Sequence, residues 1–217
     1  MSNKKITAPK GTHDVLPDRV HVWQFLERNM LKTCSEYGYK QIRFPVFEHT
    51  ELFNRGVGDT TDVVQKEMYT FFDKGNRSIT LRPEGTASTV RSYIENNLYA
   101  NPLPVKLFYT ITCYRYERPQ AGRYREFNQF GVENFGSASP LTDAEVISLA
   151  MLLLKRLGVE GLTLYINSIG CPECRKKYNE TLKAFLRAHE DGLCVLCRDR
   201  MERNPLRVLD CKNPDCQ

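Results

Sequence analysis

The sequence predicts an α+β fold in which helices flank a largely antiparallel sheet. Its periodicities give the order helix, strands, helix, two long strands and helix, which favours such a core over a doubly wound one. The two long strands, Val105–Glu117 and Arg125–Phe135, are separated only by a short polar loop. From Gly170 the composition becomes charged and rich in cysteine, which predicts a core domain of residues 1–169 and a partial, helical second domain of residues 170–217.

The first predicted elements are a helix and an interrupted strand. Apolar residues recur at helical spacing over 18–37, and Gly38 is suited to end that helix. Lys40–Glu48 is rich in β-branched and aromatic residues, but Pro45 in its middle lacks an amide hydrogen. We therefore expect this strand at a sheet edge or at an interface.

A hairpin and a helix follow. The turn formers at 73–76 separate two predicted strands, Glu67–Phe72 and Arg77–Arg82. Pro83 closes the second strand, and a helical pattern then covers Glu84–Leu98.

The long strands are followed by one more helix and one more strand. Thr142–Glu145 has the form of a capping box and predicts a helix that runs to about Leu157. Leu162–Ile166 is predicted to be a short strand.

The bulk composition is that of an ordinary globular protein, with 41% hydrophobic and 26% charged residues. No apolar run approaches the length that a bilayer requires, and the first five residues, Met-Ser-Asn-Lys-Lys, lack the apolar core of a secretory signal. These features predict a cytoplasmic protein. A net charge of +5 suits a protein that binds polyanions but is weak evidence for one.

The two long strands carry an unusual set of polar side chains. Because side chains alternate along a strand, Arg115 and Glu117 share one face, and so do Phe127, Gln129 and Glu133 on the returning strand. If these faces coincide, they gather an arginine suited to phosphate, a ring suited to stacking on a base, and acids suited to an ammonium group. A solvated hairpin with charges on its wet face explains the same pattern equally well.

Five segments resemble motifs of one family, the histidyl-tRNA synthetases, which are class II aminoacyl-tRNA synthetases. They occur in family order and span nearly the whole chain. They are the opening Pro9–Pro17, motif 1 in Asp18–Glu48, the amino-acid-binding loop Arg82–Thr86, motif 2 in Tyr114–Gly131, and an insertion-domain segment, Asn204–Pro214.

The resemblance implies that histidine is activated with ATP and magnesium and then transferred to tRNA(His). Arg115 would be the catalytic residue, binding the ATP α-phosphate and stabilising charge there as the histidine carboxylate attacks. Phe127 would stack on adenine. The other implied contacts are Glu84, Gly85, Thr86, Gln129 and Glu133 for histidine, Glu117 and Arg123 for ATP, and Arg118 and Gln120 for the tRNA acceptor end.

Simpler interpretations stay open for two of these residues. Glu84 also suits the N-terminal end of a helix, where an acid complements the helix dipole. Arg123 is as well explained by a solvated arginine. For Gln129 and Glu133 the resemblance favours recognition of histidine, because buried polar groups reject ligands that cannot pair with them.

Six of the eight cysteines lie after Gly170. Cys171-Pro-Glu-Cys174 and Cys194-Val-Leu-Cys197, with nineteen residues between them, match the spacing of a four-cysteine structural zinc site. Cys211 and Cys216 are further candidates. Unligated thiols or redox pairs are the alternatives.

Several rival functions share parts of this pattern. The main alternative is a non-catalytic paralogue that serves as a regulatory subunit in histidine biosynthesis. Others are a tRNA-sensing regulator and the synthetases for threonine, proline or serine. The resemblance further implies a homodimer formed through motif 1, and later family motifs that do not follow Gln217. We therefore expect the chain alone to bind ATP or histidine poorly and to activate histidine slowly or not at all.

Overall fold

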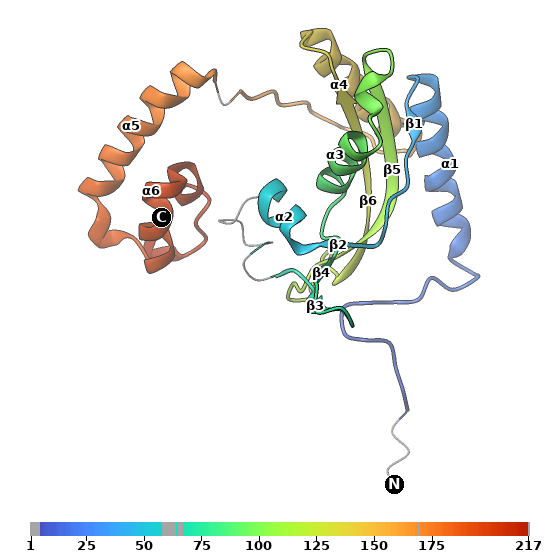
Figure 1. Cartoon of the computed structure of the whole chain (residues 1–217), viewed down its shortest axis with the longest axis horizontal. Coiled ribbons are helices and arrows are strands. Elements are labelled where there is room, and N and C mark those ends of the chain that lie inside the picture. Colours follow the sequence, from blue (N-terminus) through green and yellow to red (C-terminus); the bar gives the residue numbers. More distant parts are fainter. Residues whose placement is uncertain (1–4, 58–63, 65–66, 169, 217) are drawn as a thin grey trace. The chain divides into compact units, whose positions relative to one another are not determined.

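A computed structural model describes residues 5–57, 64, 67–168 and 170–216 of the chain (Figure 1). The chain forms two compact units, an N-terminal unit, Met1–Gly161, and a C-terminal unit, Leu162–Gln217. The division into functional domains after residue 169 stays a prediction.

The N-terminal unit is built on two three-stranded sheets, which are largely antiparallel as predicted. In the first, β5 pairs antiparallel with β6 and parallel with the short β1. In the second, β4 lies between β2 and β3 and is antiparallel to both. The strands are β1 (Lys40–Gln41), β2 (Phe47–His49), β3 (Thr70–Phe72), β4 (Ser78–Leu81), β5 (Val105–Tyr114) and β6 (Glu126–Phe135).

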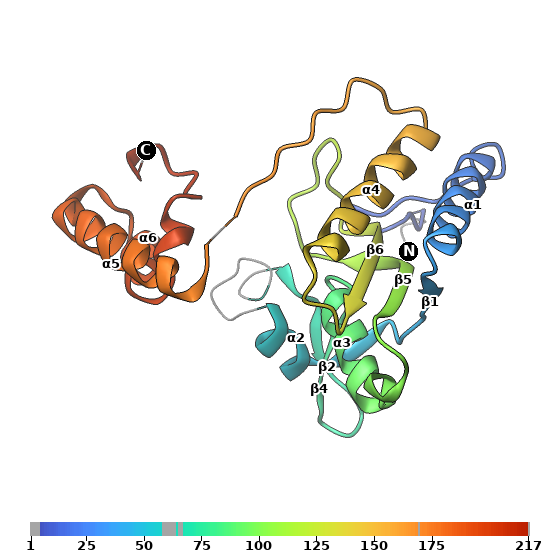
Figure 2. The same cartoon turned by 90° about the horizontal axis from the view of Figure 1, so that it is seen from above.

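Helices cover the β5–β6 pair. On one face, α1 (Val20–Glu36) and α4 (Pro140–Arg156) pack so that Cys34 and Leu149 contact Phe108. Figure 2 shows these two helices on one side of the strands and α3 (Thr86–Glu95) on the other. The short α2 (Thr50–Val57) follows β2.

The opposite face of β5–β6, here called the site face, carries Tyr109, Ile111 and Cys113, which pack with Phe127. Its side chains have odd residue numbers in both strands, because β5 and β6 pair Tyr109 with Gly131 and Cys113 with Phe127. The alternation predicted from the sequence is therefore confirmed.

Several predicted elements differ from the structure. The predicted strands Glu67–Phe72 and Val105–Glu117 are shorter, as β3 starts at Thr70 and β5 ends at Tyr114. Lys40–Glu48 is not one strand, since β1 and β2 belong to different sheets and the chain changes sheets near Pro45, although both pieces lie at sheet edges as expected. Helix α4 starts at Pro140 rather than at Thr142, because the Ser139 hydroxyl accepts a hydrogen bond from Leu141 N and proline suits the first turn.

Leu162–Ile166 is also not a strand. Within the described part of the chain no strand pairs with this segment, and its Tyr165 side chain is 87% exposed. High β propensity does not form a strand without a partner that completes its hydrogen bonds.

The C-terminal unit contains α5 (Pro172–Ala188) and α6 (Val195–Arg203), followed by short 3-10 turns at Pro205–Val208 and Pro214–Cys216. Its core consists of the buried side chains Leu182, Leu186, Leu193, Cys197, Met201 and Val208. No helix among the described residues combines the length and the apolar character needed to cross a membrane.

Candidate active site and cysteine cluster

Arg115 lies one residue beyond β5, where it still pairs with the returning strand through its backbone, N to Arg125 O at 2.9 Å. Its Nε donates to Pro83 O at 2.9 Å, and its guanidinium carbon lies 5.1 Å from the centre of the Phe127 ring. The side chain therefore faces both the site face and the Arg82–Thr86 loop. Its planar guanidinium has the geometry that suits phosphate, and one of its terminal nitrogens lies 3.9 Å from a Glu117 carboxylate oxygen.

Two residues that sequence reasoning assigned to histidine, Gln129 and Glu133, share the site face with Phe127. In the pairing of β5 with β6, Gln129 stands opposite Ile111, Gly131 opposite Tyr109 and Glu133 opposite Leu107. The Gln129 side-chain oxygen lies 3.5 Å from the Cys113 sulfur, which can donate to it. Arginine, aromatic ring, amide and carboxylate thus follow one another along a single surface.

Tyr109 connects the two motifs, and sequence reasoning missed it. Its ring is 2% exposed, and its hydroxyl donates to Glu133 Oε1 at 3.2 Å. A Cβ atom added at Gly85 or at Gly131 would lie 2.4 Å or 2.3 Å from this ring. Glycine is therefore required at both positions for the loop and the strand to reach the ring.

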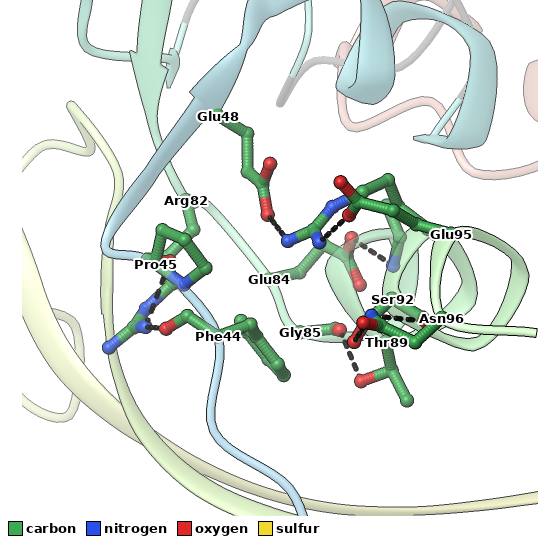
Figure 3. A network of polar contacts seen from close by, with 12 residues as sticks. Phe44, Pro45, Glu48, Arg82, Glu84, Gly85, Thr89, Ser92, Glu95 and Asn96 are labelled. Carbon is green, nitrogen blue, oxygen red and sulfur yellow. Dashed lines mark hydrogen bonds and ion pairs between the residues drawn. The ribbon is translucent and has the colours of Figure 1, made fainter. Parts of the chain in front are cut away.

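Glu84 opens helix α3 (Figure 3). Its two carboxylate oxygens accept hydrogen bonds from Thr86 N at 2.6 Å and Ala87 N at 2.9 Å. The carboxylate therefore occupies the N-terminal end of a helix, as the simpler interpretation of this residue held.

Glu133 has an altered acidity. Burial raises its pKa above the ordinary value, hydrogen bonds from Thr86 and Tyr109 lower it, and the nearby negative charge of Glu84 raises it again. The Glu133 carboxylate thus lies near the Glu84 carboxylate and the hydroxyl groups of Thr86 and Tyr109. Such a group attracts a cation, because a positive ligand offsets the repulsion between the acids.

The loop between β5 and β6 carries the remaining predicted residues. The Glu117 carboxylate lies 3.9 Å from Arg115 and 3.4 Å from Arg123, so it links the two arginines. Gln120 and Arg123 form an isolated bridge that closes the loop. Arg118 and Gln120 are exposed, and the Arg123 side chain is 62% exposed.

These motifs match known proteins. A family model described as histidyl-tRNA synthetase matches residues 11–173. The chain belongs to this family. The histidine–tRNA ligase of Acetivibrio thermocellus is 61% identical over 210 residues, which cover 97% of this chain and 50% of that protein. The chain therefore spans about half the length of the curated relatives it matches.

Solved structures give the same result. The crystal structure of apo histidyl-tRNA synthetase from S. aureus superposes with a TM-score of 0.78 at 43% identity, covering 94% of this chain and 48% of that one. A protein from Bacillus halodurans, described as an ATP phosphoribosyltransferase regulatory subunit/histidyl-tRNA synthetase, gives a TM-score of 0.66 at 22% identity. The match covers 100% of this chain and 55% of that protein. At this identity the likeness shows only a shared fold.

Arg82, the first residue of the loop that resembles the family's amino-acid-binding loop, has a structural role that sequence reasoning did not assign. It is 7% exposed, and its guanidinium donates to Thr112 O at 2.7 Å. It also donates to Phe44 O at 3.0 Å and to Pro45 O at 3.1 Å (Figure 3). Arg82 therefore holds the chain crossing at Pro45 against the end of β5. Desolvation lowers its pKa from the usual value.

A cavity of about 1000 Å³ opens between α2 and α3 of this family member. It shares only Glu84 and Thr86 with the predicted site residues, and its wall includes Arg91, which bridges Glu48 and Glu95 (Figure 3). The site face with Arg115 lies outside its lining. The candidate active site is therefore identified by the side chains that it brings together and not by the size of a cavity.

The predicted zinc ligands come together only in part. The sulfur atoms of Cys194, Cys197, Cys211 and Cys216 all lie within 4.8 Å of one another. Cys171 and Cys174 are exposed at the start of α5 and do not belong to this group.

Proposed function

We propose that this chain supplies the ATP- and histidine-binding face of a histidine–tRNA ligase. The observation that carries the proposal is the position of Arg115, held by Pro83 O beside Phe127 on the surface that also carries Gln129 and Glu133. The membership of the chain in the histidyl-tRNA synthetase family supports the same assignment.

In the proposed reaction, a carboxylate oxygen of histidine attacks the α-phosphorus of ATP. The bond between that phosphorus and the bridging oxygen breaks, and pyrophosphate leaves with the electron pair. Arg115 would bind the α-phosphate and stabilise the negative charge that accumulates there, an electrostatic role that needs no covalent intermediate. Phe127 would offer its ring to adenine beside this arginine.

Histidine would bind beside Glu84, Thr86 and Glu133, on the strand face that also carries Gln129. The raised pKa of Glu133 supports this proposal, because a positive ammonium group or an imidazole N–H would stabilise the charged form of a buried carboxylate. A ligand without such donors would leave buried polar groups unpaired, which is the physical basis for selecting histidine. Gly85 would let the loop approach the ligand closely.

Glu117 and Arg123 would act at the phosphate end of ATP. The Glu117 side chain is 14% exposed and offers oxygen atoms, the ligand type that magnesium prefers, beside two arginines. When bound with the ATP phosphates, magnesium would supply positive charge to the leaving pyrophosphate. The exposed Arg118 and Gln120 would contact the acceptor end of tRNA(His), whose terminal ribose hydroxyl then displaces AMP from the adenylate.

We further propose a cytoplasmic homodimer formed through motif 1. A groove of about 380 Å³ is lined by α1, β1 and β5, and Leu31 on its wall is 50% exposed. Helix α1 exposes Val22 and Phe25 as well, and several exposed apolar residues on one helix suit contact with a second copy of the chain.

Histidine-dependent exchange of pyrophosphate into ATP tests the proposal. We expect exchange from a form of the chain extended to the full length of its relatives, and slow or undetectable exchange from the 217-residue chain. Substituting threonine, proline or serine for histidine should abolish the signal. An extended protein that exchanges with none of these amino acids, or equally with all, would contradict the assignment.

A further inference from the structure

We propose that the C-terminal unit binds one zinc ion through the sulfur atoms of Cys194, Cys197, Cys211 and Cys216. All four atoms lie within 4.8 Å of one another. In a tetrahedral site with Zn–S bonds of about 2.3 Å, neighbouring sulfurs are about 3.8 Å apart. Only a small contraction would therefore convert this cluster into a complete set of zinc ligands.

The backbone around the cluster is arranged to stabilise thiolates. Cys194 N donates to the Cys216 sulfur at 3.0 Å, and Asn213 N donates to the Cys211 sulfur at 3.4 Å. Hydrogen bonds of this kind to ligand atoms orient them and stabilise their charged form. Cys194 is the residue that precedes α6, and Cys197 lies in its first turn, where the helix dipole favours negative charge.

The cluster is also part of the core of its unit. Cys197 is fully buried among Leu193, Met201 and Val208, and the other three cysteines pack against that core. A unit of this size buries few apolar residues, and small domains commonly need a metal or disulfides in addition. The ion would join the start of α6 to the 3-10 turns that follow it. With four protein ligands and no open position, its role would be structural rather than catalytic.

The ligand set differs from the one that cysteine spacing alone suggests. Cys171 and Cys174 form an equally spaced C-x-x-C pair, but they are exposed and lie outside the cluster. They therefore provide a matched control within the same unit. The site is independent of the proposed ligase reaction, so the two proposals stand or fall separately.

Elemental analysis of the full 217-residue chain, purified under reducing conditions without chelators, tests the site. We expect about one zinc per chain in the wild type and in Cys171→Ser/Cys174→Ser, and almost none in Cys194→Ser/Cys197→Ser. The opposite dependence on the two pairs would overturn the ligand set. Iron in place of zinc, or no metal in the wild type, would overturn the proposal.

A measurement on the wild type avoids reliance on variants that fail to fold. With iodoacetamide and peptide mass spectrometry, Cys171 and Cys174 should react quickly, whereas the four cluster cysteines should react only after a chelator removes the metal. Equal labelling of both groups before chelation would contradict the proposal. Recovery of the cluster cysteines as disulfides would contradict it as well.

Discussion

Replacing Gly131 by alanine tests whether Tyr109 is wedged between the two motifs. The added Cβ would lie 2.3 Å from Tyr109 Cζ, whereas ordinary contacts begin at 3.4 Å, so ring and strand would have to separate by about 1.1 Å. The ring has little room to move, because it is 2% exposed and also lies 2.4 Å from the position that a Cβ atom would take at Gly85.

Overpacking of this kind typically costs about 1–3 kcal/mol. For a chain of this length each kcal/mol lowers the melting temperature by about 2–4 °C, so we expect a decrease of about 2–12 °C. The same displacement moves the Tyr109 hydroxyl away from Glu133, which should also weaken histidine binding in the extended protein.

Thermal unfolding followed by circular dichroism, with calorimetric titration of histidine, measures both effects. Gly192→Ala is the matched control, because no atom lies within 4 Å of the Cβ position there. If Gly131→Ala melts at the same temperature as Gly192→Ala and binds histidine normally, the packing argument is wrong.

Three further predictions concern the same site. Because burial raises the pKa of Glu133 above 4.5, its favourable contribution to folding is complete below that pH and is lost as the pH rises through the folded-state pKa. Glu133→Gln should therefore stabilise the chain in urea unfolding at pH 7, by an amount that shrinks below pH 4.5, while weakening histidine binding. A difference in unfolding free energy between variant and wild type that does not change with pH would contradict this. Tyr109→Phe removes one hydrogen bond to Glu133 and should weaken histidine binding about tenfold, as measured by calorimetry, whereas unchanged affinity would exclude a positioning role. Arg82→Ala leaves three backbone carbonyls without their donor and should cost about 3 kcal/mol in urea unfolding, against at most about 1 kcal/mol for the exposed Arg77→Ala; similar losses would refute the structural role of Arg82.

The site face could be predicted from the sequence because its information is local. Strict alternation along two long strands with a short connecting loop leaves little freedom in their register, so the shared face of Phe127, Gln129 and Glu133 follows directly. Tyr109 could not be found in this way. Its importance depends on Gly85, which only the folded structure brings to the ring, although the glycines within both motifs were a usable signal.

Other differences between the sequence-based expectations and the structure have equally specific causes. Leu162–Ile166 has strand propensity, but propensity does not provide a pairing partner. For the metal ligands, two equally spaced C-x-x-C pairs suggested one four-cysteine set, whereas the fold of the short C-terminal unit brings Cys211 and Cys216 to Cys194 and Cys197. Spacing along the chain indicates chemistry more reliably than it indicates which residues meet.

The most direct test of the proposed function is pyrophosphate exchange by the extended protein carrying Arg115→Ala, compared with Arg118→Ala. Loss of the phosphate-binding guanidinium should lower exchange by about 100-fold or more. The exposed Arg118, proposed to contact tRNA only, should leave exchange unchanged and reduce transfer to tRNA. Exchange at the wild-type rate by Arg115→Ala would contradict the account.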